Sequence, residues 1–241
     1  MSDSYSGYTY RRYKKRLRLF PFVVAGIGIL VIFLTMNLFV GCVNLGTKQG
    51  TGATVPAVTF YTTESEVLNS KSQALEKAST IKNAGGAGYL RTSGTGFAVI
   101  DDICVNQIEG SKKYTSTKKT IKLTNKDHQD MVGVLAGTFQ STFEVLCGYI
   151  HKFEAGELTQ SEISDSARLA YNNLVDLTGE FERIQETAKS TDYHTLLTYL
   201  TRQLFGLNLI WLEGSSANFL HVLRNSACWV IFAYFDLANT L

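Results

Sequence analysis

The four histidines of this chain are the first residues to consider for metal binding or general base catalysis. His128, His151, His194 and His221 are far apart in the sequence. None stands in an HExxH arrangement, which places two imidazoles and a glutamate on one helix face. Only His151 has a carboxylate, that of Glu154, one helical turn away. Two ligands do not make a metal site, so we expect no metal ion.

Serine and cysteine nucleophiles lack the partners that would activate them. The sequence contains no GxSxG turn, no SxxK with its matching motifs, and no cysteine–histidine pair in a recognisable local context. Asp101 and Asp102 are adjacent, but neighbouring strand residues point to opposite faces and would not flank one glycosidic bond. The glycine-rich stretches 85–88 and 94–96 lack the lysine and the helix of a phosphate loop. We therefore expect no catalytic residue, no cofactor and a non-enzymatic protein.

The cysteines show no CxxC spacing. A disulfide between Cys147 and Cys228 and buried free thiols are the two alternatives for the C-terminal part. We expect free thiols, because unpaired cysteines are commonly buried as small apolar residues.

The chain that would position these residues has a strongly asymmetric charge distribution. Residues 1–18 contain six basic residues and one acidic residue, which gives +5, and since the whole chain of 241 residues carries +2, the remainder carries −3. With 45% apolar and 18% charged residues, the chain can bury a core and is not disordered. Because the basic charge is local, nucleic-acid binding by the rest of the chain is not expected.

Residues 19–43 follow the basic tail and contain no ionisable side chain except the Cys42 thiol. A helix of this length reaches roughly 37 Å, enough to cross a hydrocarbon core of about 30 Å. The preceding positive charge favours a cytoplasmic N-terminus, so residues 44–241 should lie outside the cytoplasmic membrane. The segment is too long for a simple cleaved signal peptide.

The sequence Phe39-Val40-Gly41-Cys42 has a small residue before a cysteine, as in a lipobox, although Phe39 replaces the usual leucine. Lipoprotein processing at Cys42 is therefore the alternative to a permanent single-pass anchor. Mass spectrometry of the mature protein separates the two, because a new N-terminus at Cys42 would identify the lipoprotein.

After the anchor we expect a flexible linker over residues 44–56, which are rich in glycine and threonine. Strands are predicted over 57–63, 89–92, 97–105 and 119–123 from their β-branched and aromatic residues. A helix is predicted over 65–84, capped by Ser65 or Asn69 and ended by Gly85-Gly86, and a weak, glycine-interrupted helix over 106–116. This order predicts a ferredoxin-like βαββαβ module over residues 57–124.

The tyrosine-rich basic tail, the anchor, the linker and two strand starts, TFYTTES and GTGFAVIDD, together resemble the SPOR (sporulation-related repeat) family, especially the anchored members of endospore-forming Firmicutes. The similarity covers roughly residues 57–124, and its motifs are loose. Around Phe60-Tyr61 the family's glutamine and glycine are missing, and Asp101-Asp102 replaces the second glycine region. The resemblance implies a small domain that binds the glycan strands of peptidoglycan and marks division or sporulation septa.

Sugar rings pack on aromatic faces, and their hydroxyls bind polar side chains. The candidate glycan contacts are therefore Tyr61, Tyr89, Arg91 and Phe97. Burial in the core is the alternative for each of them.

The remainder, residues 127–241, changes to helical periodicity. Helices are predicted over 127–153, from Thr159 or Ser161 to 189, over 193–212 and over 216–237, with Thr159 and Glu162 as a capping box. Short connections predict an antiparallel helical bundle. His221, Arg224 and Asp236 interrupt the last helix, so we expect a core helix and not a second membrane span.

The sequence as a whole predicts an α+β protein with one N-terminal transmembrane helix, a SPOR-type module and a C-terminal bundle. The expected function is a non-enzymatic, single-pass cell-envelope protein that binds peptidoglycan glycan strands in cell division or sporulation. The alternative is an interaction or scaffold protein whose bundle docks a membrane or divisome partner.

Overall fold

The computed structural model describes residues 52–122, 126–188 and 191–240. The predicted basic tail, the predicted membrane segment and most of the predicted linker lie outside these ranges. Across the described ranges, no helix combines the length and apolar character needed to span a membrane. The elements in chain order are β1 (Gly52–Val55), β2 (Thr59–Glu64), α2 (Lys71–Asn83), β3 (Tyr89–Ser93), β4 (Gly96–Cys104), β5 (Lys112–Thr115), β6 (Lys119–Lys122), α3 (Lys126–Glu154), α4 (Gln160–Ala188), α5 (Thr191–Leu212) and α6 (Phe219–Thr240).

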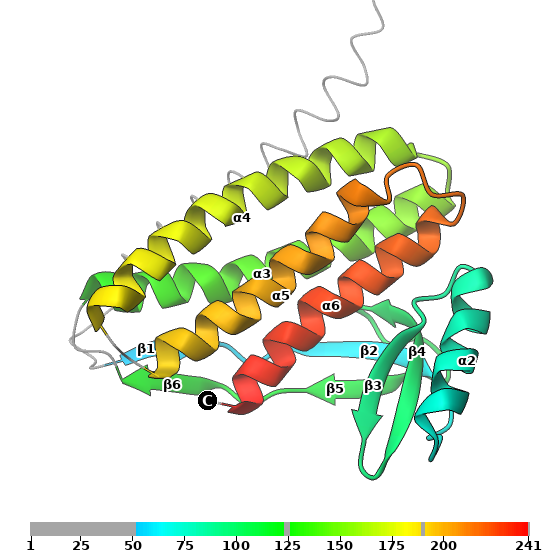
Figure 1. The fold of residues 1–241 in the computed structure, drawn as a ribbon, viewed down its shortest axis with the longest axis horizontal. Helices are drawn as coiled ribbons and strands as arrows, with labels where there is room; N and C mark the ends of the chain where they lie inside the picture. The colour runs from blue at the N-terminus through cyan, green and yellow to red at the C-terminus, as the bar shows by residue number, and fades with distance from the viewer. Residues whose placement is uncertain (1–51, 123–125, 189–190, 241) are drawn as a thin grey trace, which may run out of the picture.

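The predicted α+β class is confirmed, with antiparallel strands on one side and long helices on the other (Figure 1). Four strands form one sheet in the order β3-β4-β2-β5, and every neighbouring pair is antiparallel. In chain order this is a strand, a helix, a hairpin and a final strand beside the first, which is the strand order expected of a ferredoxin-like unit without its second helix.

The predicted helix over 106–116 is wrong. Gly110 adopts a positive φ of 74°, and the Ser111 side chain and backbone both bond to Ile108 within a turn. The strand that completes the sheet is therefore β5. The predicted closing strand over 119–123 exists as β6, but it pairs with β1 in a separate two-stranded sheet.

Residues 52–55, which the sequence placed in a flexible linker, form β1. Ala53 and Val55 are buried, and the strand pairs with β6. β1 and β2 follow each other along the chain, as do β5 and β6, so the two sheets form one long ribbon (Figure 1). At the break after Pro56, the Ser116 N–H donates to the Val58 carbonyl and the Val58 N–H donates to the Ser116 hydroxyl, each over 3.0 Å. These bonds satisfy the backbone where proline interrupts the ladder.

Helix α2 packs against the β3–β4 hairpin through a small apolar cluster. Ala74, Ala78 and Val99 form its buried centre, and Leu68, Ile81, Leu90 and Phe97 surround them. The predicted caps Ser65 and Asn69 do not start the helix, because residues 65–68 first hydrogen-bond to the edge of β4. The helix begins after Ser70, and Gly85, with φ 90°, follows its end as expected.

The four predicted C-terminal helices are confirmed within a few residues. The capping box at the start of α4 is also present: the Thr159 N–H and hydroxyl each donate to Glu162 over 2.8 Å. Helix α6 lies between α3 and α5, and α5 also packs on α4, whereas α3 and α4 scarcely touch (Figure 1). The helices therefore do not close into a four-helix bundle, and α6 lies across the sheet.

Candidate functional site

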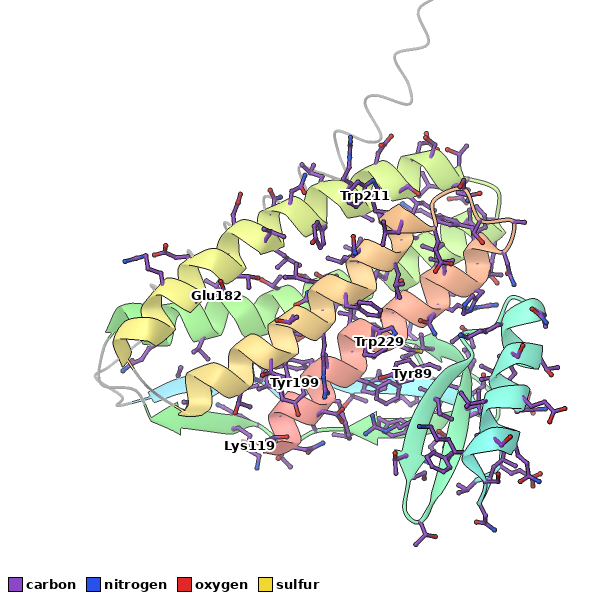
Figure 2. The ribbon with its side chains drawn as sticks, viewed as in Figure 1. Tyr89, Lys119, Glu182, Tyr199, Trp211 and Trp229 are labelled. Atoms are coloured by element: carbon purple, nitrogen blue, oxygen red, sulfur yellow. The ribbon has the colours of Figure 1, made fainter. Side chains whose placement is uncertain are left out.

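Tyr89 and Arg91, two of the four candidate glycan contacts, lie on β3 in the face of the sheet that α6 covers. The Tyr89 ring stacks on Phe232, with centroids 5.4 Å apart, and meets Trp229 edge to face at the same distance. Figure 2 shows Tyr89 and Trp229 together where α6 crosses the sheet. Burial raises the pKa of the Tyr89 hydroxyl well above its usual range. The ring is therefore part of the packing between sheet and helix.

Arg91 is held over the same aromatic cluster. Its guanidinium carbon lies 4.2 Å from the centre of the Phe232 ring and 5.1 Å from that of Phe235, and its Nη2 lies 3.2 Å from Asp236. Arg202 also approaches Asp236, at 3.6 Å. Cation–π contacts and an ion pair thus fix Arg91 to α6, and only 19% of its side chain is exposed.

Phe97 lies on the opposite face, in the cluster beneath α2, and its backbone N–H and carbonyl both bond to Leu68. Tyr61 lies on β2 and is half-buried. It is directly opposite Lys113 of β5, and Thr59 and Thr115 form the next pair on this face, with hydroxyl oxygens 3.2 Å apart. The structure therefore separates the four candidates into Tyr89 and Arg91 under α6, Phe97 under α2, and Tyr61 on the outer face of the β2–β5 pair.

Polar residues on α6 and just before it bind the end of α2 and the loop that follows it. The Asn218 amide donates to the Lys82 carbonyl, His221 Nδ1 lies 2.9 Å from the Gly86 carbonyl, and Asn225 donates to the Ala87 carbonyl over 2.8 Å. A carbonyl can only accept, so the neutral His221 carries its proton on Nδ1. These bonds satisfy carbonyls at and beyond the C-terminal end of α2.

Arg224 connects three parts of the chain. Its Nε lies 3.0 Å from Asp102 in β4, its Nη2 donates to Glu154 at the end of α3 over 2.8 Å, and its Nη1 donates to the Gly85 carbonyl. The side chain is 16% exposed. Asp102 is therefore part of an ion-pair network, while Asp101 is exposed at an irregularity of the β2–β4 ladder.

These contacts give the expected module and the helical part a common core. Buried residues of β1, β2, β4, β6 and all four C-terminal helices belong to one continuous apolar cluster. The expected division between residues 57–124 and 127–241 falls between β6 and α3, but the packing is not divided there.

Cys104, Cys147 and Cys228 are buried free thiols, and the last two belong to this core. Burial raises the pKa of each thiol, so each is held as the unreactive protonated form. Within the described ranges, no three histidine, cysteine, aspartate or glutamate side chains are grouped as metal ligands.

A cavity of about 270 Å³, which the sequence reasoning missed, lies between α3 and α4. Leu146 of α3, Ala167, Ala170 and Leu174 of α4 and Leu207 of α5 provide its apolar lining. Serine, threonine and alanine within the apolar stripes of α3 and α4 are the sequence signal that could have indicated it. Small side chains there leave space unfilled because α4 packs on α5 and not closely on α3.

No family model, curated protein or solved structure that was compared matches this chain.

Proposed function

We propose that this chain is a non-enzymatic cell-envelope protein, anchored by residues 19–43, whose extracytoplasmic part is a scaffold that docks a membrane or divisome partner. The observation that carries the proposal is the use of Tyr89 and Arg91 in binding α6. A sheet face that holds a helix is not free to bind a ligand. The sheet then serves as the structural support on which the helices pack.

The helical part also exposes large apolar side chains. Phe205, Trp211 and Leu212 on α5 are 46%, 46% and 65% exposed. Apolar groups gathered on one element are typical of surfaces that contact another protein. Val67, Leu75, Val105 and Ile108 of the sheet part are exposed as well. Leu212 of α5 is the most exposed of these large apolar side chains, so we assign docking to the helices.

The test is photo-crosslinking in growing and sporulating cells from a benzoylphenylalanine placed at Leu212 of the full chain. We expect one or a few discrete adducts with envelope proteins. Glu182, on the outer part of α4, is the matched control position and should give none (Figure 2). Equal adducts from both positions, or none from Leu212, would contradict the scaffold proposal. Point substitutions are preferable to deletion of 127–241, because deletion would also remove α6 from the core.

Peptidoglycan binding is retained as a second candidate because of the outer face of β2 and β5. Tyr61 presents an aromatic ring beside Lys113, with the hydroxyls of Thr59 and Thr115 nearby. An aromatic face surrounded by donors and acceptors suits a sugar ring. This proposal moves the expected glycan contact from Tyr89, Arg91 and Phe97 to Tyr61.

Co-sedimentation of fragment 44–241 with peptidoglycan sacculi tests this second candidate. Enrichment on sacculi stripped of stem peptides over intact sacculi is expected, together with a loss of most binding in Tyr61→Ala. Tyr171 is a half-buried tyrosine of α4 and provides the matched control. The Tyr171→Ala variant should bind sacculi as the parent does. Equal binding to stripped and intact sacculi, or binding that persists in Tyr61→Ala, would contradict peptidoglycan binding through Tyr61.

A further inference from the structure

The cavity between α3 and α4 has a lining that specifies the chemistry of a ligand. Its volume of about 270 Å³ exceeds that of an engineered apolar cavity of about 150 Å³ that takes up benzene. Its interior is predominantly aliphatic, and Ser141, Thr142, Glu144, Tyr149 and Asn173 bring polar atoms to the lining. An apolar interior with a few polar groups is typical of small-molecule sites.

Three hydroxyl groups of this lining have already used their protons. Thr138 donates to the Val134 carbonyl over 2.8 Å, Ser141 donates to the Thr138 carbonyl, and Ser166 donates to the Glu162 carbonyl. Each hydroxyl oxygen keeps lone pairs that can accept a hydrogen bond. These three lining residues therefore present acceptors to a ligand.

Glu144 adds further acceptors. Gln203, which is not itself in the lining, donates its amide protons to the lining residue Thr142 and towards the Thr138 carbonyl. Glu144 accepts a bond from Gln140 and keeps further lone pairs. A ligand that donates hydrogen bonds would satisfy these acceptors.

The charge of the lining disfavours an anionic head group. Glu144 is the one ionisable carboxylate among the lining residues, and none of them is lysine, arginine or histidine. An anionic head group would face Glu144 without a compensating cation, whereas an ammonium group would be attracted to it.

From these observations we propose that the α3–α4 cavity binds the alkyl chain of a single-chain amphiphile whose head group donates hydrogen bonds and carries no negative charge. A long-chain amine or alcohol has this chemistry. The chain lies on Leu146, Ala170, Leu174 and Leu207, and the head group binds the acceptors of Ser141, Ser166 and Glu144. This binding site is separate from the docking surface of α5 and goes beyond the scaffold function.

The experiment uses the full chain in phosphatidylcholine nanodiscs and three photoactivatable probes. Decylamine, decanol and decanoate each carry an aliphatic diazirine in the chain, and labelled peptides are mapped by mass spectrometry. Labelling is normalised to that of phosphatidylcholine in the same sample, which corrects for partition into the lipid. We expect the amine and the alcohol to label residues 141–149 and 166–174 about tenfold more than decanoate does.

Two substitutions test the site itself. Ala170→Phe fills the cavity and should abolish most labelling by the amine and the alcohol. Val175→Phe adds the same bulk to the same helix at a position 42% exposed and outside the lining, and should leave the labelling unchanged. Glu144→Gln keeps the shape and removes the charge, so labelling by the amine should fall while the alcohol still binds. Because Glu144 is exposed, this variant tests the proposal even where Ala170→Phe impairs folding.

Three outcomes would overturn the proposal. Decanoate could label the cavity as well as the other probes, which would contradict selection by acceptors and charge. Labelling that persists in a folded Ala170→Phe protein would place the probe elsewhere. Labels confined to residues 205–212, or absent from α3 and α4 altogether, would show that the cavity takes up no alkyl chain.

Discussion

Helices α6 and α4 bury very different fractions of their surface. Thirteen of the 22 residues of α6 are buried, on several sides of the helix, because the helix lies between the sheet, α3 and α5. Helix α4 is longer, with 29 residues, yet its buried side chains in the described part are those of Ile163, Ala167, Leu174 and Thr178. Helix α6 thus packs against the sheet and two other helices, while α4 forms one wall of the α3–α4 cavity.

The polar residues of the two helices differ in the same way. On α6, His221, Arg224 and Asn225 bind backbone or carboxylate groups of other elements. On α4, Arg183 pairs with Glu180 one turn away, on the solvent-exposed side. The polar residues of α6 therefore join distant parts of the chain. On α4 the ion pairs of the described part join neighbours in sequence, and Gln160, at its first residue, donates to the distant Ser216 carbonyl.

Removal of an aromatic ring from α6 should give the largest effect. The side chain of Phe232 is fully buried and contacts Phe60, Tyr89 and Arg91. Phe232→Ala should lower the free energy of unfolding by about 4 kcal/mol. Because the core is shared, urea unfolding of fragment 44–241 should remain a single transition by both circular dichroism and tryptophan fluorescence.

Leu174→Ala on α4 is the matched comparison for Phe232→Ala. Leu174 is 2% exposed but borders the existing cavity, so its loss should cost about 2 kcal/mol. A Phe232→Ala protein in which the sheet and the helices unfold separately would disprove the shared core, and a larger loss from Leu174→Ala would reverse the roles of the two helices.

Removal of a charge should have the next largest effect. Arg224→Met leaves Asp102 and Glu154 without their cation and should cost about 2 kcal/mol, less than for a fully buried pair because both carboxylates are partly exposed. Arg183→Met breaks an exposed pair on α4 and should leave the urea midpoint unchanged. Equal midpoints for the two variants would show that the ion pairs of α6 contribute no more than surface pairs.

The helices could be predicted from sequence because helical periodicity is local. The stripes over 127–153 and 193–212 and the capping box at Thr159 follow from residues three or four positions apart. The strands β3 and β4 were equally evident from their composition. In contrast, β1 depends on pairing with β6 and on burial against distant residues, and a glycine-rich, threonine-rich sequence gives no local sign of that partner.

The candidate site likewise depends on contacts between residues that are distant in sequence. Strand alternation implies that Tyr89 and Arg91 share one face of β3, but it does not show that α6, more than a hundred residues later, covers that face. The cavity depends on the distance between α3 and α4, which is set by their separate packing on α6 and α5. Neither arrangement is encoded in a short sequence window.

A smaller, local effect is expected at the start of α4. Thr159→Ala removes the hydroxyl that donates to Glu162 and accepts from its N–H, which should destabilise the first turn by about 1 kcal/mol. Since α4 is peripheral, faster hydrogen exchange should be confined to residues near 160–163. The neighbouring exposed position provides the control, Ser161→Ala, which should not change exchange there. Faster exchange in α6 as well would show that α4 and α6 open together.

The smallest effect concerns pH and the contact of α6 with the loop after α2. Burial lowers the pKa of His221 below its usual value, and the charge of Lys82 acts in the same direction. The folded protein therefore binds a proton at His221 less readily than the unfolded chain does. The resulting stabilisation is complete above the unfolded pKa of about 6.5 and declines as the pH falls through it towards the lower folded value.

His221→Asn keeps a donor near the position of Nδ1 and removes the titrating group. Between about pH 7.5 and about pH 5.5, the urea midpoint of the parent should therefore fall further than that of His221→Asn. His151→Asn, at an exposed position near the end of α3, should follow the parent. A parent and a His221→Asn variant with the same pH dependence would mean that His221 titrates alike in the folded and unfolded chains. In that case α6 would hold the loop through Asn218, Arg224 and Asn225 without a contribution from burial of the imidazole.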